Sequence, residues 1–158
     1  MRKVISKRLG GRGNLILADI VWTFEVLANN FDLAGSASQV AKSRLKQLSL
    51  PTELIRKIVI SMYEGEINMV IHADGGIATL TVTPTEIIVV LKDTGKGIEN
   101  VELALKEGYT TADSQIRELG FGAGMGLPNM KKYSDNLVID TEINVGTTIT
   151  MTFKLNKK

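Results

Sequence analysis

The sequence predicts an α+β fold, a two-layer sandwich in which a mostly antiparallel sheet carries helices on one face. Runs rich in β-branched and apolar residues occur in neighbouring pairs, at residues 77–93 and 136–155. One uninterrupted helical pattern of more than twenty residues follows Pro51. Because strands are grouped with strands instead of alternating one by one with helices, an antiparallel sheet is expected.

The chain is predicted to hold one folded domain behind a short extension. Its 158 residues, 44% of them hydrophobic, can bury an apolar core without disulfides or metals. Residues 1–20 are basic and rich in glycine, with few positions that could pack. We interpret them as an N-terminal extension that is mobile or pairs with a partner, and residues 21–158 as the domain.

Composition argues against several classes of partner and location. The net charge is +2, from 19 basic and 17 acidic residues spread along the chain. Neither nucleic acid nor a membrane surface is therefore expected as a partner. There is no cysteine, which fits a cytoplasmic protein. No apolar run approaches the roughly 18 residues that span a bilayer.

The first half of the domain is expected to contain two helices and three strands. Residues 20–28, "IVWTFEVLA", are rich in strand formers and end at the turn-prone "NNFD". A helix is expected over 36–48, and Pro51 suits the first turn of the long helix that follows. The runs 77–84 and 86–93 lie close together and alternate in polarity, which predicts an antiparallel pair.

The second half has a weaker pattern before it returns to strands. A helix is expected over 101–107, and residues 108–119 are expected to form a mobile segment without a regular pattern. Another helix begins near Leu127 and ends near Asp135. Two strands, over 136–142 and 147–155, close the chain around a turn at residues 144–146.

Three polar side chains interrupt the long apolar helix. Glu64, Asn68 and His72 follow one another at four-residue spacing, so they share one stripe of its surface. The stripe faces either solvent or a polar cavity, since a buried and unpaired carboxylate would cost several kcal/mol. His72 is the only histidine, and we interpret it as a hydrogen-bonded residue of the helix end, not a metal ligand.

Two glycine-rich segments indicate a phosphate-bearing ligand. Residues 93–98 read "DTGKGI" after a strand, and residues 120–128 read "GFGAGMGLP" before a helix. Their spacing fits neither the P-loop nor the dinucleotide fingerprint. Exposed backbone N–H groups beside a helix N-terminus favour a phosphate, whereas the alternative is that these glycines only end elements or loosen a linker.

Taken together, four motifs resemble the GHKL superfamily of ATPases, which includes sensor histidine kinases, gyrase and mismatch-repair ATPases. "EGEIN" at 64–68 is similar to its E-x-x-x-N box, and "DTGKGI" to its D-x-G-x-G-I box. "GFGAGMGL" is similar to its second glycine box, and "GTTITMTF" at 146–153 to its closing strand. "ELALKEGYTTA" and "GMGLPNMKKYSDNLVI" most resemble the small bacterial anti-sigma factor and switch-protein serine kinases.

The resemblance implies the GHKL (Bergerat) fold and a cytoplasmic, Mg-ATP-dependent serine/threonine kinase. Its protein partner would be a small STAS-domain anti-sigma antagonist, a sigma factor, or both, and homologous switch proteins often form homodimers. The alternative is an ATP-gated anti-sigma or switch module that binds its partner with little or no phosphotransfer. The implied cofactors are ATP and Mg²⁺.

The resemblance also implies roles for particular residues. Glu64 would be the general base, and Asn68 would coordinate Mg²⁺. Asp93 would accept a hydrogen bond from the adenine amino group. The other expected ligand-binding residues are Gly95, Gly97, Ile98, Gly122, Gly124, Gly126, Leu127 and Thr148, with Thr147 as the alternative to Thr148.

Some features depart from the family pattern. Glu66 adds a second acid, but it lies about 200° around the helix from Glu64 and is expected to face elsewhere. The segment 108–120 is expected to act as a lid that orders when nucleotide binds. It is longer than in the shortest switch kinases, and it supplies Arg117 as a candidate contact to the γ-phosphate.

Overall fold

A computed structural model describes residues 3–6 and 19–155. Its strands form one six-stranded sheet in the order β1-β2-β3-β4-β6-β5, and every neighbouring pair is antiparallel. The strands are β1 (Lys3–Ser6), β2 (Asp19–Val26), β3 (Gly76–Val82), β4 (Glu86–Asp93), β5 (Asn136–Glu142) and β6 (Gly146–Lys154).

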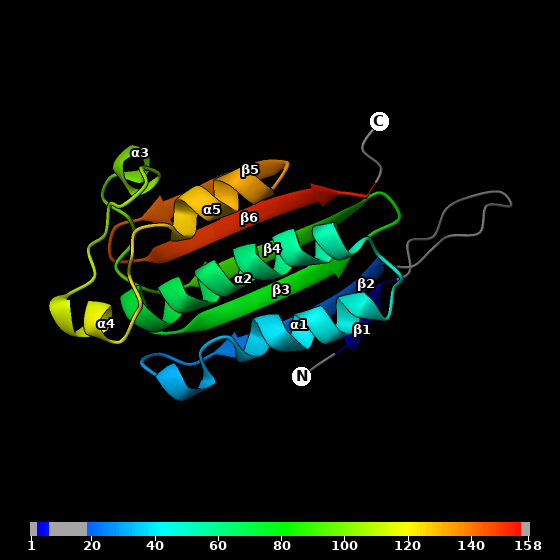
Figure 1. Ribbon diagram of the computed structural model, residues 1–158, viewed down its shortest axis with the longest axis horizontal. Helices are drawn as coiled ribbons and strands as arrows, with labels where there is room; N and C mark the ends of the chain where they lie inside the picture. Colours follow the sequence, from blue (N-terminus) through cyan, green and yellow to red (C-terminus); the bar gives the residue numbers. More distant parts are fainter. Residues whose placement is uncertain (1–2, 7–18, 156–158) are drawn as a thin grey trace, which may run out of the picture.

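The helices form the second layer on one face of this sheet (Figure 1). This layer consists of α1 (Ser36–Lys46), α2 (Thr52–His72) and α5 (Gly126–Tyr133). The shorter elements η1 (Phe31–Leu33), α3 (Val101–Ala104) and α4 (Ser114–Glu118) lie toward one end of the sandwich (Figure 1). The predicted α+β fold, with its helices on one face of an antiparallel sheet, is confirmed.

The core lies between the two layers and follows from strand alternation. Every second residue of β6, namely Ile149, Met151 and Phe153, is buried, because successive side chains of a strand point to opposite faces. The same face of β4 carries Ile87, Val89 and Leu91, and α2 packs Ile58 and Met62 against the sheet. Apolar burial between the layers therefore fixes which face of each strand meets the helices.

A buried carboxylate joins the first two helices. Glu66 is 1% exposed, and its two oxygens each accept a backbone hydrogen bond of 3.0 Å, from the N–H groups of Ala37 and Ser38. These residues lie in the first turn of α1, whose N-cap, Gly35, has no capping side chain. Glu66 faces away from the Glu64 stripe, as expected, and satisfies N–H groups that a helix start leaves unpaired.

Several element predictions differ from the structure. The helix expected over 101–107 ends at Ala104, and α4 lies within the segment expected to have no regular structure. The strand expected over 20–28 corresponds to β2, which is not at the edge of the sheet because β1 pairs with it. Residues 3–6 of the predicted extension form this β1 strand, and residues 7–18 lie outside the described part. The division into extension and domain stays a prediction.

In residues 3–6 and 19–155, no helix is both long enough and apolar enough to cross a bilayer.

Candidate functional site

A cavity of about 550 Å³ opens at one end of the molecule, between the helix layer and the loops that follow β4 and α3. This volume is typical of small-molecule sites, which measure roughly 300 to 1,000 Å³. Residues from α2, from the 93–100 loop, from the 109–128 segment and from β6 line it. Both glycine-rich segments therefore meet at the same cavity, although they are far apart in sequence.

The polar stripe of α2 forms one wall of the cavity. Glu64, Asn68 and His72 all line it. Of the two alternatives for this stripe, a polar cavity and bulk solvent, the structure confirms the cavity. Gly126, the first residue of α5, lies opposite Glu64 and Asn68. A Cβ built on Gly126 would lie 3.5 Å from Glu64 Oε2 and 3.4 Å from Asn68 Oδ1. The bare backbone of α5 thus approaches the acid and the amide closely.

At the other end of the cavity, Asp93 is held by backbone donors. Its Oδ1 accepts hydrogen bonds from the N–H groups of Gly95, at 2.8 Å, and Thr147, at 3.0 Å. Asp93, Gly97 and Ile98 line the cavity. Gly95 is not a lining residue, since its Cα faces the end of α2, where an added Cβ would meet Ala73. Its contribution is the hydrogen bond to Asp93.

Of the two neighbouring threonines, the structure places Thr147 in the cavity and Thr148 outside it. The reason is the alternation of β6: Thr147 shares the inner face with Ile149, whereas Thr148 points to the opposite face of the sheet. Thr147 also reaches Thr141 through a 3.0 Å hydrogen bond between their hydroxyls. The choice of Thr148 is therefore corrected to Thr147, a position that the buried series of β6 could have indicated.

The second glycine segment closes over the cavity. Gly122, Gly124, Gly126 and Leu127 all line it. The N–H of Gly108 donates a 2.9 Å hydrogen bond to the carbonyl of Gly124, which ties the two ends of the 108–124 segment together. Gly124 has a φ of +73°, and a Cβ there would lie 2.5 Å from the carbonyl carbon of Gly108. Glycine is needed here for both backbone conformation and space.

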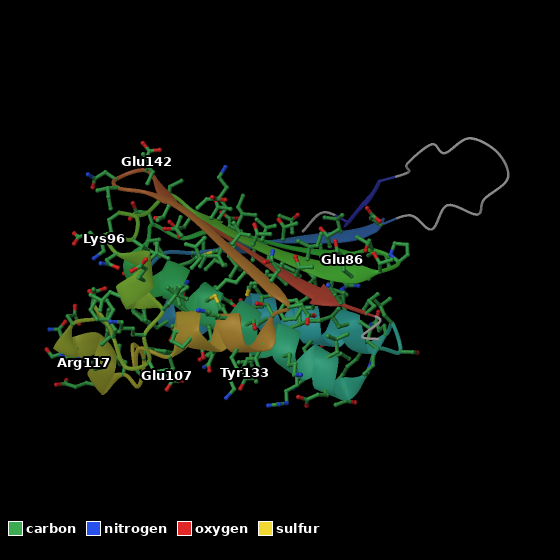
Figure 2. All side chains as sticks on the ribbon, turned by 90° about the horizontal axis from the view of Figure 1, so that it is seen from above. Glu86, Lys96, Glu107, Arg117, Tyr133 and Glu142 are labelled. Atoms are coloured by element: carbon green, nitrogen blue, oxygen red, sulfur yellow. The ribbon has the colours of Figure 1, made fainter. Side chains whose placement is uncertain are left out.

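The 108–124 segment has an aromatic contact of its own but does not bring Arg117 to the site. The Phe121 ring packs on Phe31, with centroids 5.7 Å apart. Arg117, on α4, is exposed and does not line the cavity. Figure 2 labels Arg117 at the outer margin of this end of the molecule, with Lys96 toward the sheet. The sequence-based choice of Arg117 is not supported by this arrangement, whereas Lys96 is a lining residue.

His72 is partly buried beside a positive charge. Desolvation first, and the charge of Lys96 second, lower the pKa of the His72 imidazole below its ordinary value. Among the described residues, no cluster of three His, Asp or Glu side chains could hold a metal ion alone. A cation at Asn68 would therefore need oxygen ligands from a bound molecule as well.

One polar contact at the site was not expected from the sequence. The side-chain amide of Asn129, on α5, donates a 2.8 Å hydrogen bond to Glu64 Oε1. Asn129 lies on the helix that follows the glycine box, but it is not among the residues that line the cavity. The only sequence signal for it is a short polar residue between the apolar positions of α5.

Comparison with known proteins agrees with this geometry. Residues 27–153 match the family described as histidine kinase-like ATPase domain. The chain belongs to this family. The resemblance to GHKL ATPases is thereby confirmed, and residues from the family's motifs line the same cavity.

Within this family, the chain is similar to several anti-sigma F factors. The chain is 30% identical over 110 residues to an anti-sigma F factor of Clostridium acetobutylicum, which covers 66% of this chain and 73% of the relative. An anti-sigma F factor of Clostridium perfringens is 31% identical over 128 residues, covering 77% of this chain and 88% of the relative. That of Caldanaerobacter subterraneus is also 31% identical, over 121 residues. The chain is thus similar to anti-sigma F factors over most of its length.

Proposed function

We propose that this protein is an ATP-dependent regulator of the anti-sigma type that transfers the γ-phosphate of Mg-ATP to a serine or threonine of a small STAS-domain partner. The similarity to anti-sigma F factors supports the regulatory role. The observation that carries the kinase assignment is the pairing at one cavity end of an acid, Glu64, and an amide, Asn68, against the bare backbone of Gly126.

The residues present fit ATP and magnesium. Asp93 lies at the end of the cavity opposite Gly126 and has a second carboxylate oxygen to accept from an adenine amino group, since Oδ1 already accepts two backbone N–H groups. Asn68 offers a neutral oxygen, and Mg²⁺ commonly combines one or two protein oxygens with phosphate oxygens and waters. Bound Mg²⁺ would supply charge neutralisation at the phosphates.

The chain's own residues then position and deprotonate the acceptor. The acceptor hydroxyl oxygen forms a bond to the γ-phosphorus, and the bond from that phosphorus to the bridging oxygen of the leaving ADP breaks. Glu64 takes the hydroxyl proton, because it is the carboxylate beside Asn68. The N–H groups of the 122–126 segment and the start of α5 favour the negative phosphates, and the lid limits access of water.

Substitution at Asp93 tests the nucleotide site. Asp93→Asn keeps an Oδ1 acceptor for Gly95 and Thr147 but replaces the second acceptor with an NH₂ group. We expect ATP affinity to fall at least tenfold by calorimetric titration, which corresponds to about 1.4 kcal/mol, with GTP and NAD bound weakly by either form. Asp140→Asn, on an exposed position of β5, is the control. Equal ATP affinity in Asp93→Asn and wild type would contradict the adenine assignment.

Substitution at Glu64 tests the transfer step. With STAS-domain proteins of the source organism as acceptors and γ-labelled ATP, wild type should label one of them on serine or threonine. Glu64→Ala should abolish labelling while ATP affinity stays within a few fold. Nucleotide-dependent capture of the partner by wild type, without any labelling, would instead establish a gated binding module. Labelling that survives Glu64→Ala would remove Glu64 from the role of base.

A further inference from the structure

We propose that Asn129 is a positioning residue for the base, Glu64. The Asn129 amide holds the Glu64 carboxylate with one oxygen directed to the cavity. This inference rests on the proposed function, because it assigns to Asn129 the orientation of the group that accepts the proton. Asn129 lies in the second layer of residues around the site, and its side-chain amide donates a 2.8 Å hydrogen bond to Glu64 Oε1.

The two oxygens of Glu64 have different surroundings. Oε1 accepts the hydrogen bond from Asn129 Nδ2, whereas Oε2 lies 3.5 Å from the position of a Cβ built on Gly126. Gly126 and Asn129 are three residues apart on α5, so they lie on the same face of that helix. One helix face therefore approaches both oxygens, and the hydrogen bond leaves Oε2 for the acceptor hydroxyl.

The direction of this hydrogen bond follows from the chemistry of the two groups. An ionised carboxylate only accepts, so the NH₂ end of the Asn129 amide is the end that faces it. The Asn129 backbone is itself fixed, since its N–H donates a 2.9 Å hydrogen bond to the Met125 carbonyl. A rigid donor thus holds the end of a long, otherwise rotatable glutamate side chain.

The expected effect is kinetic. Without the donor, the Glu64 carboxylate can rotate out of line with the acceptor hydroxyl, and a displacement of about 1 Å can cost on the order of 100-fold in rate. Adenine and phosphate contacts do not involve Asn129, which is absent from the cavity lining. A positioning role therefore predicts a fall in kcat with little change in the KM for ATP.

The first test compares isosteric and control variants in labelling of the STAS-domain acceptor. Asn129→Leu keeps the branched shape without the donor, and we expect kcat to fall roughly 10- to 100-fold, with KM for ATP within twofold. Asn129→Gln restores an amide and should recover part of the rate. Lys131→Leu, an exposed position of the same helix, should behave as wild type. Urea denaturation of each variant reports any loss of folding.

The second test uses the pH profile, which a purely structural contact would not alter. Asn129→Asp places a carboxyl against Glu64, and two carboxylates at this distance cannot both ionise readily. A shared proton mimics the amide donor, and its loss at higher pH produces repulsion. The rate of Asn129→Asp relative to wild type should therefore fall as pH rises from about 6 to about 9, whereas that of Asn129→Leu should stay constant.

The outcomes separate this inference from the proposed function. If wild type labels an acceptor and Asn129→Leu has an unchanged kcat, the positioning role is wrong and the kinase assignment stands. Equal loss of kcat and of ATP affinity in a folded variant would also refute it, because the contact would then support the whole site. If wild type labels no acceptor, both proposals fall together.

Discussion

The buried carboxylate of Glu66 gives the most direct energetic test of the fold. Glu66→Ala removes both acceptors of the Ala37 and Ser38 N–H groups, each bonded at 3.0 Å. These donors lie in the first turn of α1, which has no capping side chain of its own. The substitution leaves them buried between α1 and α2 without an acceptor among the described side chains.

The magnitude follows from these two hydrogen bonds. Each bond to a charged acceptor contributes about 1.5 to 3 kcal/mol. The lower end is expected, because removing the carboxylate also relieves the cost of burying it. Glu66→Ala should therefore lower the free energy of unfolding by about 3 kcal/mol. At about 2 to 4 °C per kcal/mol for a chain of this size, Tm should fall by about 6 to 12 °C.

Urea denaturation and thermal scans of wild type, Glu66→Ala and Glu66→Gln measure this effect. Glu66→Gln keeps one acceptor and faces an NH₂ group toward the other donor, so it should lose at least about 1.5 kcal/mol. Glu53→Ala is the matched control on the same helix, since Glu53 is exposed and forms ion pairs with Arg56 and Lys57, and it should show no measurable change. Wild-type stability in Glu66→Gln would refute the double-acceptor role.

Two further predictions concern the lid and the histidine. Gly124→Ala should open the lid, raise tryptic cleavage after Lys106 and Arg117, and weaken ATP binding roughly tenfold, because its Cβ would meet Gly108. Gly120→Ala should keep more of the affinity, because Gly120 also has a positive φ, of +87°, but an added Cβ there would have no neighbour within 4 Å. Identical cleavage with and without ATP in wild type would argue against a gating lid. Because the pKa of His72 is lowered on folding, its contribution to stability is complete above the unfolded value of about 6.5 and is lost as pH falls below it. His72→Asn should remove that part of the pH dependence of Tm, and an unchanged pH dependence would contradict it.

Local patterns were enough to predict most elements. Alternation of apolar and polar residues predicts the strands at 77–93 and 136–155, and helical periodicity predicts the long helix after Pro51. Both patterns depend only on near neighbours in the chain. The missed helix α4 also has a local signal, since Asp113 accepts a 2.9 Å hydrogen bond from the Ile116 N–H as an N-cap. The signal was missed because α4 is short and is followed by a glycine-rich segment.

The candidate site was predictable where its residues share one element. Glu64, Asn68 and His72 lie on one helix stripe, so their spacing alone predicted that they would face the same space, and the structure adds that this space is the cavity. Thr147 could have been chosen over Thr148 from the buried alternation of β6. Arg117 was a poor choice because nothing in a sequence states how a lid segment is oriented.

The sequence by itself determined most of the secondary structure, the order of the motifs and the family resemblance that the comparisons confirmed. Only the tertiary structure decided which polar groups meet across elements. Asn129 and Glu64 are 65 positions apart, and Glu66 and Ala37 are 29 apart. Such pairs depend on how α1, α2 and α5 pack side by side on the sheet. Burial of apolar residues drives that packing, but the hydrophobic effect is not directional. The apolar pattern therefore does not specify which individual polar atoms pair.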